Sequence, residues 1–229
     1  MCQTHLISKL QRVFREKVKS LSIQETPAPT CFNAVRCTDL NELISIEDQK
    51  TYRSGVGILL FLVKYSRPGI SNAVRELAKA NDGATKLHFK SLMRTIKYVI
   101  DTRDMSLQYK IDDKVKNDGV WCIKAYCDSD FAGDIDKRIS GSGYCIYLMG
   151  CLTAWKSKGQ MQVTLSSTEA EYVAISDVCT KIMFVKMILE FLGVRVRLPI
   201  IVRCDNIGAT FLSYNAKISQ LSMHIDTKH

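Results

Sequence analysis

The stretch WCIKAYCDSDFAGDIDKRISGSGYCIYLMGCLTAWK, residues 121–156, determines the fold of the second half of the chain. Its first segment, WCIKAYC, predicts a strand that ends at Asp128. The segments GYCIYLM (143–149) and CLTAWK (151–156) predict two more strands, joined as a hairpin around Gly150. This half of the chain is therefore expected to begin with three strands.

The sequence that follows predicts a helix, a strand and a second helix. Ser166 and Glu169 have the spacing of a capping box and open a long helix, which Gly193 ends. The segment LPIIVRC (198–204) predicts a strand, and residues 206–212 predict a short helix. Three strands, a helix, a strand and a helix indicate an α/β fold in which helices flank a mixed sheet.

The first hundred residues predict helices. An amphipathic helix over residues 3–20 is expected to bury the apolar side chains Leu6, Leu10, Val13 and Phe14. Residues 21–44 are expected to form a loop, and further helices are predicted at 45–65, 70–80 and 84–100. In the last of these, one apolar stripe is typical of core packing: Phe89, Leu92, Met93, Ile96, Val99 and Ile100.

A polar, turn-like segment separates the two halves. Residues 105–111 predict a strand, and IDDKVKNDG follows it, so we place a domain boundary near residues 112–119. The chain is therefore expected to contain a mainly helical domain over residues 1–114 and an α/β domain over residues 119–229.

The charge of the chain suits a polyanionic partner. The formal net charge is +9 over 229 residues. Residues 1–100 hold 16 Lys and Arg against 8 Asp and Glu, whereas residues 120–229 hold 12 against 10. A basic first half favours contact with nucleic acid, although basic residues are also common on solvated helix faces.

The cysteines and apolar segments limit the protein class. Nine cysteines without a CxxC pair or a signal-peptide pattern indicate a reducing compartment, and the scattered histidines predict no zinc site. The longest strongly apolar run, residues 55–63, is shorter than the roughly 20 residues that span a bilayer. No membrane partner is expected.

Four acidic residues stand where a predicted strand or helix meets a turn: Asp128 in AYCDSDFAGD, Glu171 in SSTEAEY, Asp205 in VRCDN and Asp226 in HID. Asp128 and Asp205 follow strands, and Glu171 is expected in the first turn of the long helix, where the helix dipole favours an acid. Taken singly, each is also typical of a turn or cap. Gathered together, carboxylates repel unless a cation lies between them, and oxygen ligands suit Mg²⁺ or Mn²⁺. Paired divalent ions are a common means of cleaving phosphodiester bonds, so the four acids predict a metal-dependent nuclease.

Three residues near the end of the third strand are candidates for nucleic-acid contact. Lys156 and Lys158 follow Trp155, and an aromatic side chain beside two lysines suits a phosphate backbone with stacked bases. Trp155 is equally compatible with a core position.

The motifs closely resemble the RNase H domain of the Pol polyprotein of copia-type LTR retrotransposons. The stretches that carry the resemblance are YCDSDFAGDIDKRISGSGYCIYLMG (126–150), AWKSKGQMQVTLSSTEAEYVAIS (154–176), VRCDNIGATFLSYN (202–215) and HIDTKH (224–229). Two earlier stretches resemble the family's connection between reverse transcriptase and RNase H: YRSGVGILLFLVKYSRPGISNAVRELAKA (52–80) and HFKSLMRTIKYVIDTRDMSLQY (88–109).

The resemblance implies an RNase H-like fold and hydrolysis of the RNA strand of RNA–DNA hybrids with two Mg²⁺ or Mn²⁺ ions. Asp128, Glu171, Asp205 and Asp226 would be the catalytic and metal-binding acids, and His224 would assist proton transfer or product release. Residues 1–114 would combine a remnant of reverse transcriptase with the connection region. The partners implied are an RNA–DNA hybrid and the remainder of the Pol polyprotein, in the cytoplasm or nucleus.

Two alternatives remain open at the level of sequence. One is a catalytically inactive relic of a Pol polyprotein that keeps the fold and weak nucleic-acid binding. This alternative is favoured by the expected truncation of the α/β domain, because the family continues past the position of His229 through a further helical segment. The other is a transposase-like nuclease with the same fold. That class uses a late Glu as its final acid, and Asp226 argues against it.

Overall fold

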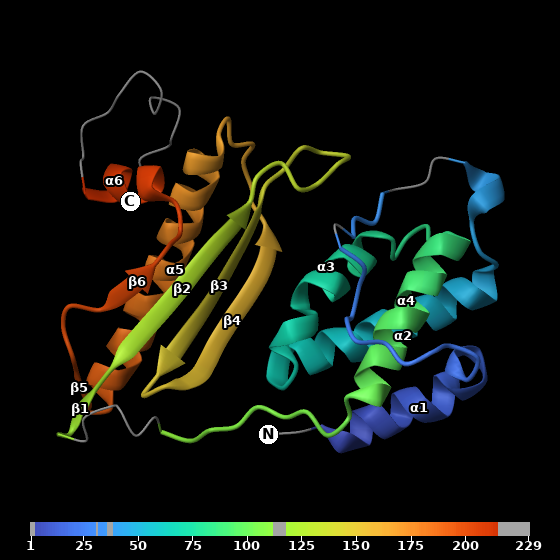
Figure 1. The fold of residues 1–229 in the computed structure, drawn as a ribbon, viewed down its shortest axis with the longest axis horizontal. Helices are drawn as coiled ribbons and strands as arrows, with labels where there is room; N and C mark the ends of the chain where they lie inside the picture. Colours follow the sequence, from blue (N-terminus) through green and yellow to red (C-terminus); the bar gives the residue numbers. More distant parts are fainter. Residues whose placement is uncertain (1–2, 31, 36–38, 112–117, 215–229) are drawn as a thin grey trace. The chain divides into compact units, whose positions relative to one another are not determined.

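The structure, a computed structural model, describes residues 3–30, 32–35, 39–111 and 118–214 (Figure 1). The chain divides into two compact units, residues 1–108 and 109–229. The boundary expected near residues 112–119 lies almost entirely outside the described residues. The domain assignments 1–114 and 119–229 therefore stay predictions.

The first unit is helical. Its described residues form α1 (Thr4–Val18), α2 (Ile46–Tyr65), α3 (Ser71–Lys79) and α4 (Lys86–Asp101), with 3-10 turns at Leu40–Glu42 and Pro68–Ile70. Helix α2 begins as the sequence predicts, because the Ser45 hydroxyl accepts the Asp48 backbone N–H at 3.1 Å. The predicted break after Tyr65 is also confirmed, since Pro68 begins a 3-10 turn before α3.

The core of this unit differs from the prediction in α1. Its buried face consists of Ile7, Leu10, Phe14 and Val18, whereas Val13 is 48% exposed. The apolar residues of α1 include adjacent pairs, and helical spacing alone does not say which member of a pair turns inward. The predicted stripe of α4 is confirmed, because Leu92, Met93, Ile96 and Val99 are buried, and Phe89 and Ile100 pack against the same core.

Gly55 lets α2 come close to two neighbouring helices. A Cβ atom at this position would lie 3.0 Å from Cζ of Phe14 in α1 and 3.1 Å from Cδ2 of Leu92 in α4. Contacts of that length are tighter than normal carbon packing, so the glycine is needed for the close approach of these helices.

The second unit contains a four-stranded mixed sheet, so the predicted α/β class is confirmed. Its strands are β2 (Ile123–Asp130), β3 (Gly141–Leu148), β4 (Cys151–Gly159) and β6 (Ile201–Arg203), in the order β4-β3-β2-β6. Strands β2, β3 and β4 are antiparallel neighbours, and β6 runs parallel to β2. A separate parallel pair joins β1 (Val120–Trp121) to β5 (Arg195–Val196).

The hairpin between β3 and β4 has a two-residue turn. Leu148 pairs with Cys151, and the residues between them, Met149 and Gly150, both have positive φ, 51° and 86°. A two-residue turn in which both residues have positive φ fits the right-handed twist of the flanking strands, and glycine adopts positive φ without strain, which explains Gly150.

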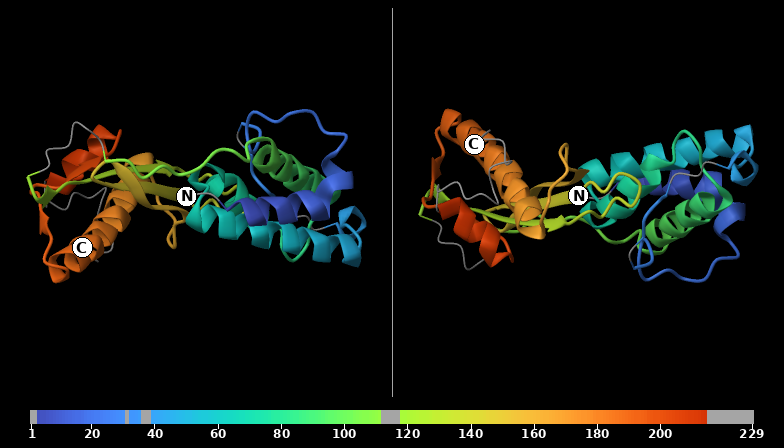
Figure 2. Two further views of the ribbon diagram at one scale, coloured as in Figure 1. Left: turned by 90° about the horizontal axis from the view of Figure 1, so that it is seen from below. Right: turned by 90° about the horizontal axis from the view of Figure 1, so that it is seen from above.

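Helix α5 (Ser167–Phe191) packs on one face of the sheet (Figures 1 and 2), and α6 (Ile207–Tyr214) follows β6. Helix α5 buries Ala174, Val178 and Ile182 in a core that it shares with the sheet residues Ile123, Ala125, Cys127 and Ile146. Because side chains alternate along a strand, this packing turns Lys124, Tyr126 and Asp128 of β2 toward the other, exposed side. Gly193, at φ 75°, ends the helix as predicted.

One predicted strand does not form. Residues 105–111 form no strand, and none of them pairs with a neighbouring strand among the described residues. A strand needs a neighbour that completes its hydrogen bonds, so local preference was not sufficient. None of the helices in the described ranges is both long and apolar enough to cross a lipid bilayer.

Candidate metal centre

Two of the predicted acids reach the same edge of the sheet because β2 and β6 are parallel neighbours. Tyr126 pairs with Arg203, so Asp128 and Asp205, each two residues further on, emerge beside each other. Parallel strands present their carboxyl ends at one edge, which is where α/β sheets commonly bind ligands. Asn206 then begins α6, since its side-chain oxygen accepts the Ala209 N–H at 2.9 Å and so fixes the junction that carries Asp205.

The third acid, Glu171, comes from α5. It lies in the second turn rather than the first turn that the sequence suggested, because α5 begins at Ser167 and Glu169 is the acid of the first turn. The capping position is confirmed in part. Ser166 accepts the Glu169 N–H at 3.1 Å, while the Glu169 carboxylate accepts the N–H of Leu165 at 2.6 Å.

Glu171 is held at the sheet edge by two hydrogen bonds. It is 5% exposed, and its Oε1 accepts the Ser129 backbone N–H at 2.8 Å. The thiol of Cys204 donates to its Oε2 at 3.3 Å. One potential ligand atom from each of Glu171, Cys204 and Asp205 lies within 4.8 Å of the others.

Asp128 lies near enough to the other two acids to feel their charges. Burial raises the pKa of Asp128, and the carboxylates of Glu171 and Asp205 raise it further. Within the part of the chain that the structure describes, no Lys or Arg forms an ion pair with these three acids. The described residues therefore gather negative charge here without supplying a cation.

The donor set fits a hard divalent cation. Carboxylate oxygens from Asp128, Glu171 and Asp205 are the ligands that Mg²⁺ and Mn²⁺ prefer. Cys204 is a softer donor, and its thiol donates to Oε2 of Glu171; burial, together with this hydrogen bond, raises the pKa of the thiol. We therefore assign Cys204 to positioning Glu171 rather than to metal ligation.

Sequence reasoning missed this role of Cys204. The available signal was its position directly before Asp205 in VRCDN. The other two predicted members of the site, Asp226 and His224, lie outside the described residues, and their roles stay predictions.

The three residues predicted to contact nucleic acid do not share one surface. Lys156 and Lys158 pair with Tyr144 and Ser142 of β3, whereas Trp155 pairs with Cys145. Strand alternation therefore directs Trp155 to the opposite face from the two lysines. Lys158 also forms an ion pair with Asp177 at 2.7 Å, so its charge is partly neutralised.

The fold and the site together define an α/β domain that gathers carboxylates at the ends of two parallel strands. The retrovirus-related Pol polyprotein from transposon RE1 of Arabidopsis thaliana is 30% identical over 223 residues, covering 96% of this chain and 14% of the relative. The corresponding polyprotein from transposon RE2 of the same plant is 33% identical, covering 79% of this chain and 12% of the relative. That from transposon TNT 1-94 of Nicotiana tabacum is 32% identical, covering 78% of this chain and 13% of the relative.

The chain belongs to the Pol polyproteins of copia-type retrotransposons. It spans 12% to 14% of the length of these curated relatives. No protein-family model matches the chain, and no solved structure gives a significant match.

Proposed function

We propose that the α/β unit is a ribonuclease H that hydrolyses the RNA strand of RNA–DNA hybrids during reverse transcription of a retrotransposon. The observation that carries the proposal is that Glu171 and Asp205 bring ligand atoms within 4.8 Å of each other at the sheet edge, near enough to Asp128 for their charges to raise its pKa. Membership of the Pol family supplies the context, because an element that copies RNA into DNA passes through such hybrids.

Asp128, Glu171 and Asp205 would hold Mg²⁺ or Mn²⁺, and Asp226 would complete the set as the resemblance implies. When bound, two such ions supply an activated water and stabilise the charge that develops on the leaving oxygen. The contribution of the described residues is to hold these carboxylates without an ion pair to a basic side chain. The Ser129 N–H and the Cys204 thiol fix the orientation of Glu171 before an ion arrives.

Selectivity for RNA would depend on contacts to 2′-hydroxyl groups and on the shape of the hybrid. The partners proposed are the RNA–DNA hybrid and the remainder of the Pol polyprotein. The compartment proposed is the cytoplasm or the nucleus.

The test is incubation of the purified chain with a labelled RNA–DNA hybrid and Mg²⁺. We expect cleavage of RNA in the hybrid but not of duplex DNA, with loss of cleavage in Asp128→Asn. The matched control is Asp136→Asn, which removes an exposed acid from the turn after β2 and should leave cleavage unchanged. Absence of cleavage by a folded wild-type chain at every Mg²⁺ and Mn²⁺ concentration would favour the inactive relic instead.

A further inference from the structure

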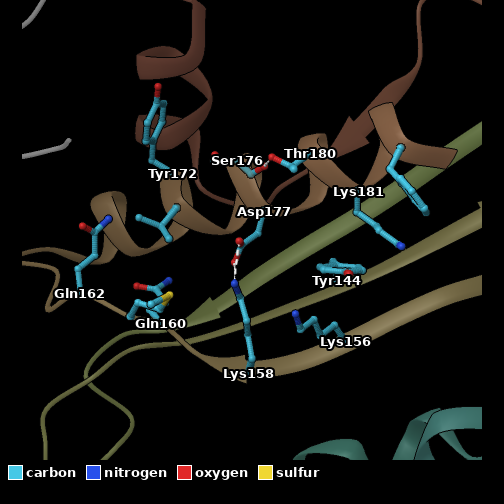
Figure 3. Close-up of a pocket in the computed structure, with 13 residues that line it drawn as sticks. Tyr144, Lys156, Lys158, Gln160, Gln162, Tyr172, Ser176, Asp177, Thr180 and Lys181 are labelled. Carbon is cyan, nitrogen blue, oxygen red and sulfur yellow. Dashed lines mark hydrogen bonds and ion pairs between the residues drawn. The ribbon is translucent and has the colours of Figure 1, made fainter. Parts of the chain in front are cut away.

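A cavity of about 560 Å³ lies between α5 and the strands β3 and β4 (Figure 3). Its size is within the range of roughly 300–1,000 Å³ that is typical of small-ligand sites. One wall is held by Gln160, which is 4% exposed and donates from Nε2 to Ser142 Oγ at 2.8 Å and to the Ala170 carbonyl at 2.9 Å. These bonds join the turn after β4 to β3 and α5, so the cavity is preformed.

The cavity is separate from the carboxylate cluster. None of Asp128, Glu171 and Asp205 lines it. Tyr144, which does line it, pairs with Cys127 in the neighbouring strand. Cys127 and Asp128 are consecutive in β2, so Asp128 alternates away from the face of Tyr144, whereas Glu171 lies on α5 directly before Tyr172, which lines the cavity while Glu171 does not.

The charged residues of the cavity favour an anion. It is lined by three lysines, Lys156, Lys158 and Lys181, and a single acid, Asp177. Lys158 and Asp177 neutralise each other at 2.7 Å. Lys156 is exposed and has no partner among the described residues, and the Lys181 ammonium lies 4.3 Å from the centre of the Phe184 ring, a contact that leaves its N–H groups available.

Aromatic side chains add a second kind of contact. Tyr144, Tyr172 and Phe184 all line the cavity, and Figure 3 shows Lys156 and Lys181 beside Tyr144. Burial, together with the nearby Asp177, raises the pKa of Tyr144, so its hydroxyl remains a neutral donor at neutral pH. Lysines beside aromatic rings can hold a phosphate and stack a base at the same time.

We propose that this cavity binds the phosphate and base of a nucleotide, either free or within a single strand of nucleic acid. Lys156 and Lys181 contact the phosphate, and the aromatic side chains contact the base. The site needs no divalent ion, so it is independent of the proposed ribonuclease activity and would exist even in an inactive relic.

The test measures binding of the full chain in the presence of EDTA by fluorescence anisotropy. Two probes distinguish the sources of the ligand: fluorescently labelled adenosine 5′-monophosphate and a labelled single-stranded oligodeoxynucleotide. The variant Lys156→Gln/Lys181→Gln should weaken binding at least about tenfold, equivalent to roughly 1.4 kcal/mol. The control Lys124→Gln/Lys137→Gln removes the same charge from exposed positions of the same unit outside the cavity and should change binding less than about twofold.

If the mononucleotide binds and the double-lysine variant weakens that binding, a free nucleotide is a sufficient ligand for the site. If only the oligonucleotide binds in this lysine-dependent way, the ligand is a single strand. Both outcomes support the site. It is overturned if neither probe binds, or if both double variants weaken binding equally, which would indicate non-specific charge attraction. Should the first double variant fail to fold, Lys156→Gln alone changes an exposed side chain and gives the same comparison with Lys124→Gln.

Discussion

Glu76 in the helical unit and Glu171 in the α/β unit are both almost completely buried, and their surroundings are opposite. Glu76 of α3 is 1% exposed and contacts two cations, Arg75 at 3.0 Å and Lys79 at 2.8 Å. Glu171 of α5 is 5% exposed, accepts hydrogen bonds only from uncharged donors among the described residues, and shares its site with two further carboxylates.

The difference separates an acid that is paired within the fold from one that we propose to bind a metal ion. A buried carboxylate is costly unless it is paired, and the helical unit pairs Glu76 from its own sequence. In the described part of the α/β unit, no basic side chain forms an ion pair with Glu171. That arrangement is unfavourable for an isolated chain and becomes favourable when a cation binds.

The largest expected effect comes from removing the paired acid. Glu76→Ala leaves two cations and the Ala34 N–H without their acceptor and should lower the free energy of unfolding by roughly 2–4 kcal/mol. Urea unfolding followed by circular dichroism measures the change. Glu16→Ala removes an exposed acid and should stay within about 0.5 kcal/mol of the parent protein. Equal effects of the two variants would remove the contrast between the glutamates.

The next effect tests the acid that we propose to bind a metal ion. Mg²⁺ at a hundred times its dissociation constant should stabilise the wild-type chain by about 2.7 kcal/mol, because the ion binds only the folded cluster. Glu171→Gln should abolish this gain while changing metal-free stability by no more than about 1 kcal/mol, since lost repulsion offsets the weaker hydrogen bonding. Thermal unfolding with EDTA or Mg²⁺ gives both quantities.

The control for Glu171→Gln is Glu190→Gln, which alters an exposed acid on the same helix. It should retain the full response to Mg²⁺. A wild-type chain that Mg²⁺ does not stabilise, or a Glu171→Gln variant that responds normally, would contradict the assignment of the cluster.

A smaller effect is expected where the two units are alike. Ser45 caps α2 and Ser166 caps α5, each by accepting a backbone N–H at 3.1 Å. Replacement of either serine by alanine should lower the free energy of unfolding by about 1 kcal/mol, as lost N-caps usually do. Urea midpoints of the two variants provide the comparison. If the Ser166 variant lost several times more free energy of unfolding than the Ser45 variant, the α5 cap would also support the carboxylate cluster through Glu171.

The smallest effect concerns pH. Burial and neighbouring carboxylates raise the pKa of Asp128 above its usual 3.8, so the folded chain binds its proton more tightly than the unfolded chain. Metal-free stability should therefore fall as pH rises from 3.8 through the raised value, and Asp128→Asn should remove this contribution. The effect is small because solvent screens a largely exposed carboxyl. The measurement is the free energy of unfolding in EDTA at several pH values across this window. If Asp128→Asn showed the same pH dependence as the parent chain, Asp128 would be excluded as the source of that dependence.

The elements that the sequence predicted well are those fixed by short-range chemistry. Ser45 and Asp48 identify the start of α2, Gly193 marks the end of α5, and the glycine at position 150 marks a hairpin turn. In each case one side chain or one allowed backbone conformation decides the structure, so neighbours in sequence carry the information.

The elements that were predicted wrongly depend on distant partners. Val13 has the spacing of a core residue, yet packing against α2 and α4 selected Ile7 and left Val13 exposed. Residues 105–111 have β-forming side chains without a partner strand among the described residues. Strand alternation likewise places Trp155 and Lys156 on opposite faces although they are adjacent in sequence, and their contact with nucleic acid stays a prediction.

The sequence by itself determined the identity and order of the acids, the helix caps, the turn glycines and the resemblance to copia-type Pol polyproteins. Only the tertiary structure decided that Asp128 and Asp205 emerge side by side, because that depends on β6 pairing in parallel with β2. It also decided that the Cys204 thiol bonds to Glu171 and that three lysines share a cavity with aromatic rings. These arrangements join residues far apart along the chain, and pairing and packing between elements determine them rather than local preference.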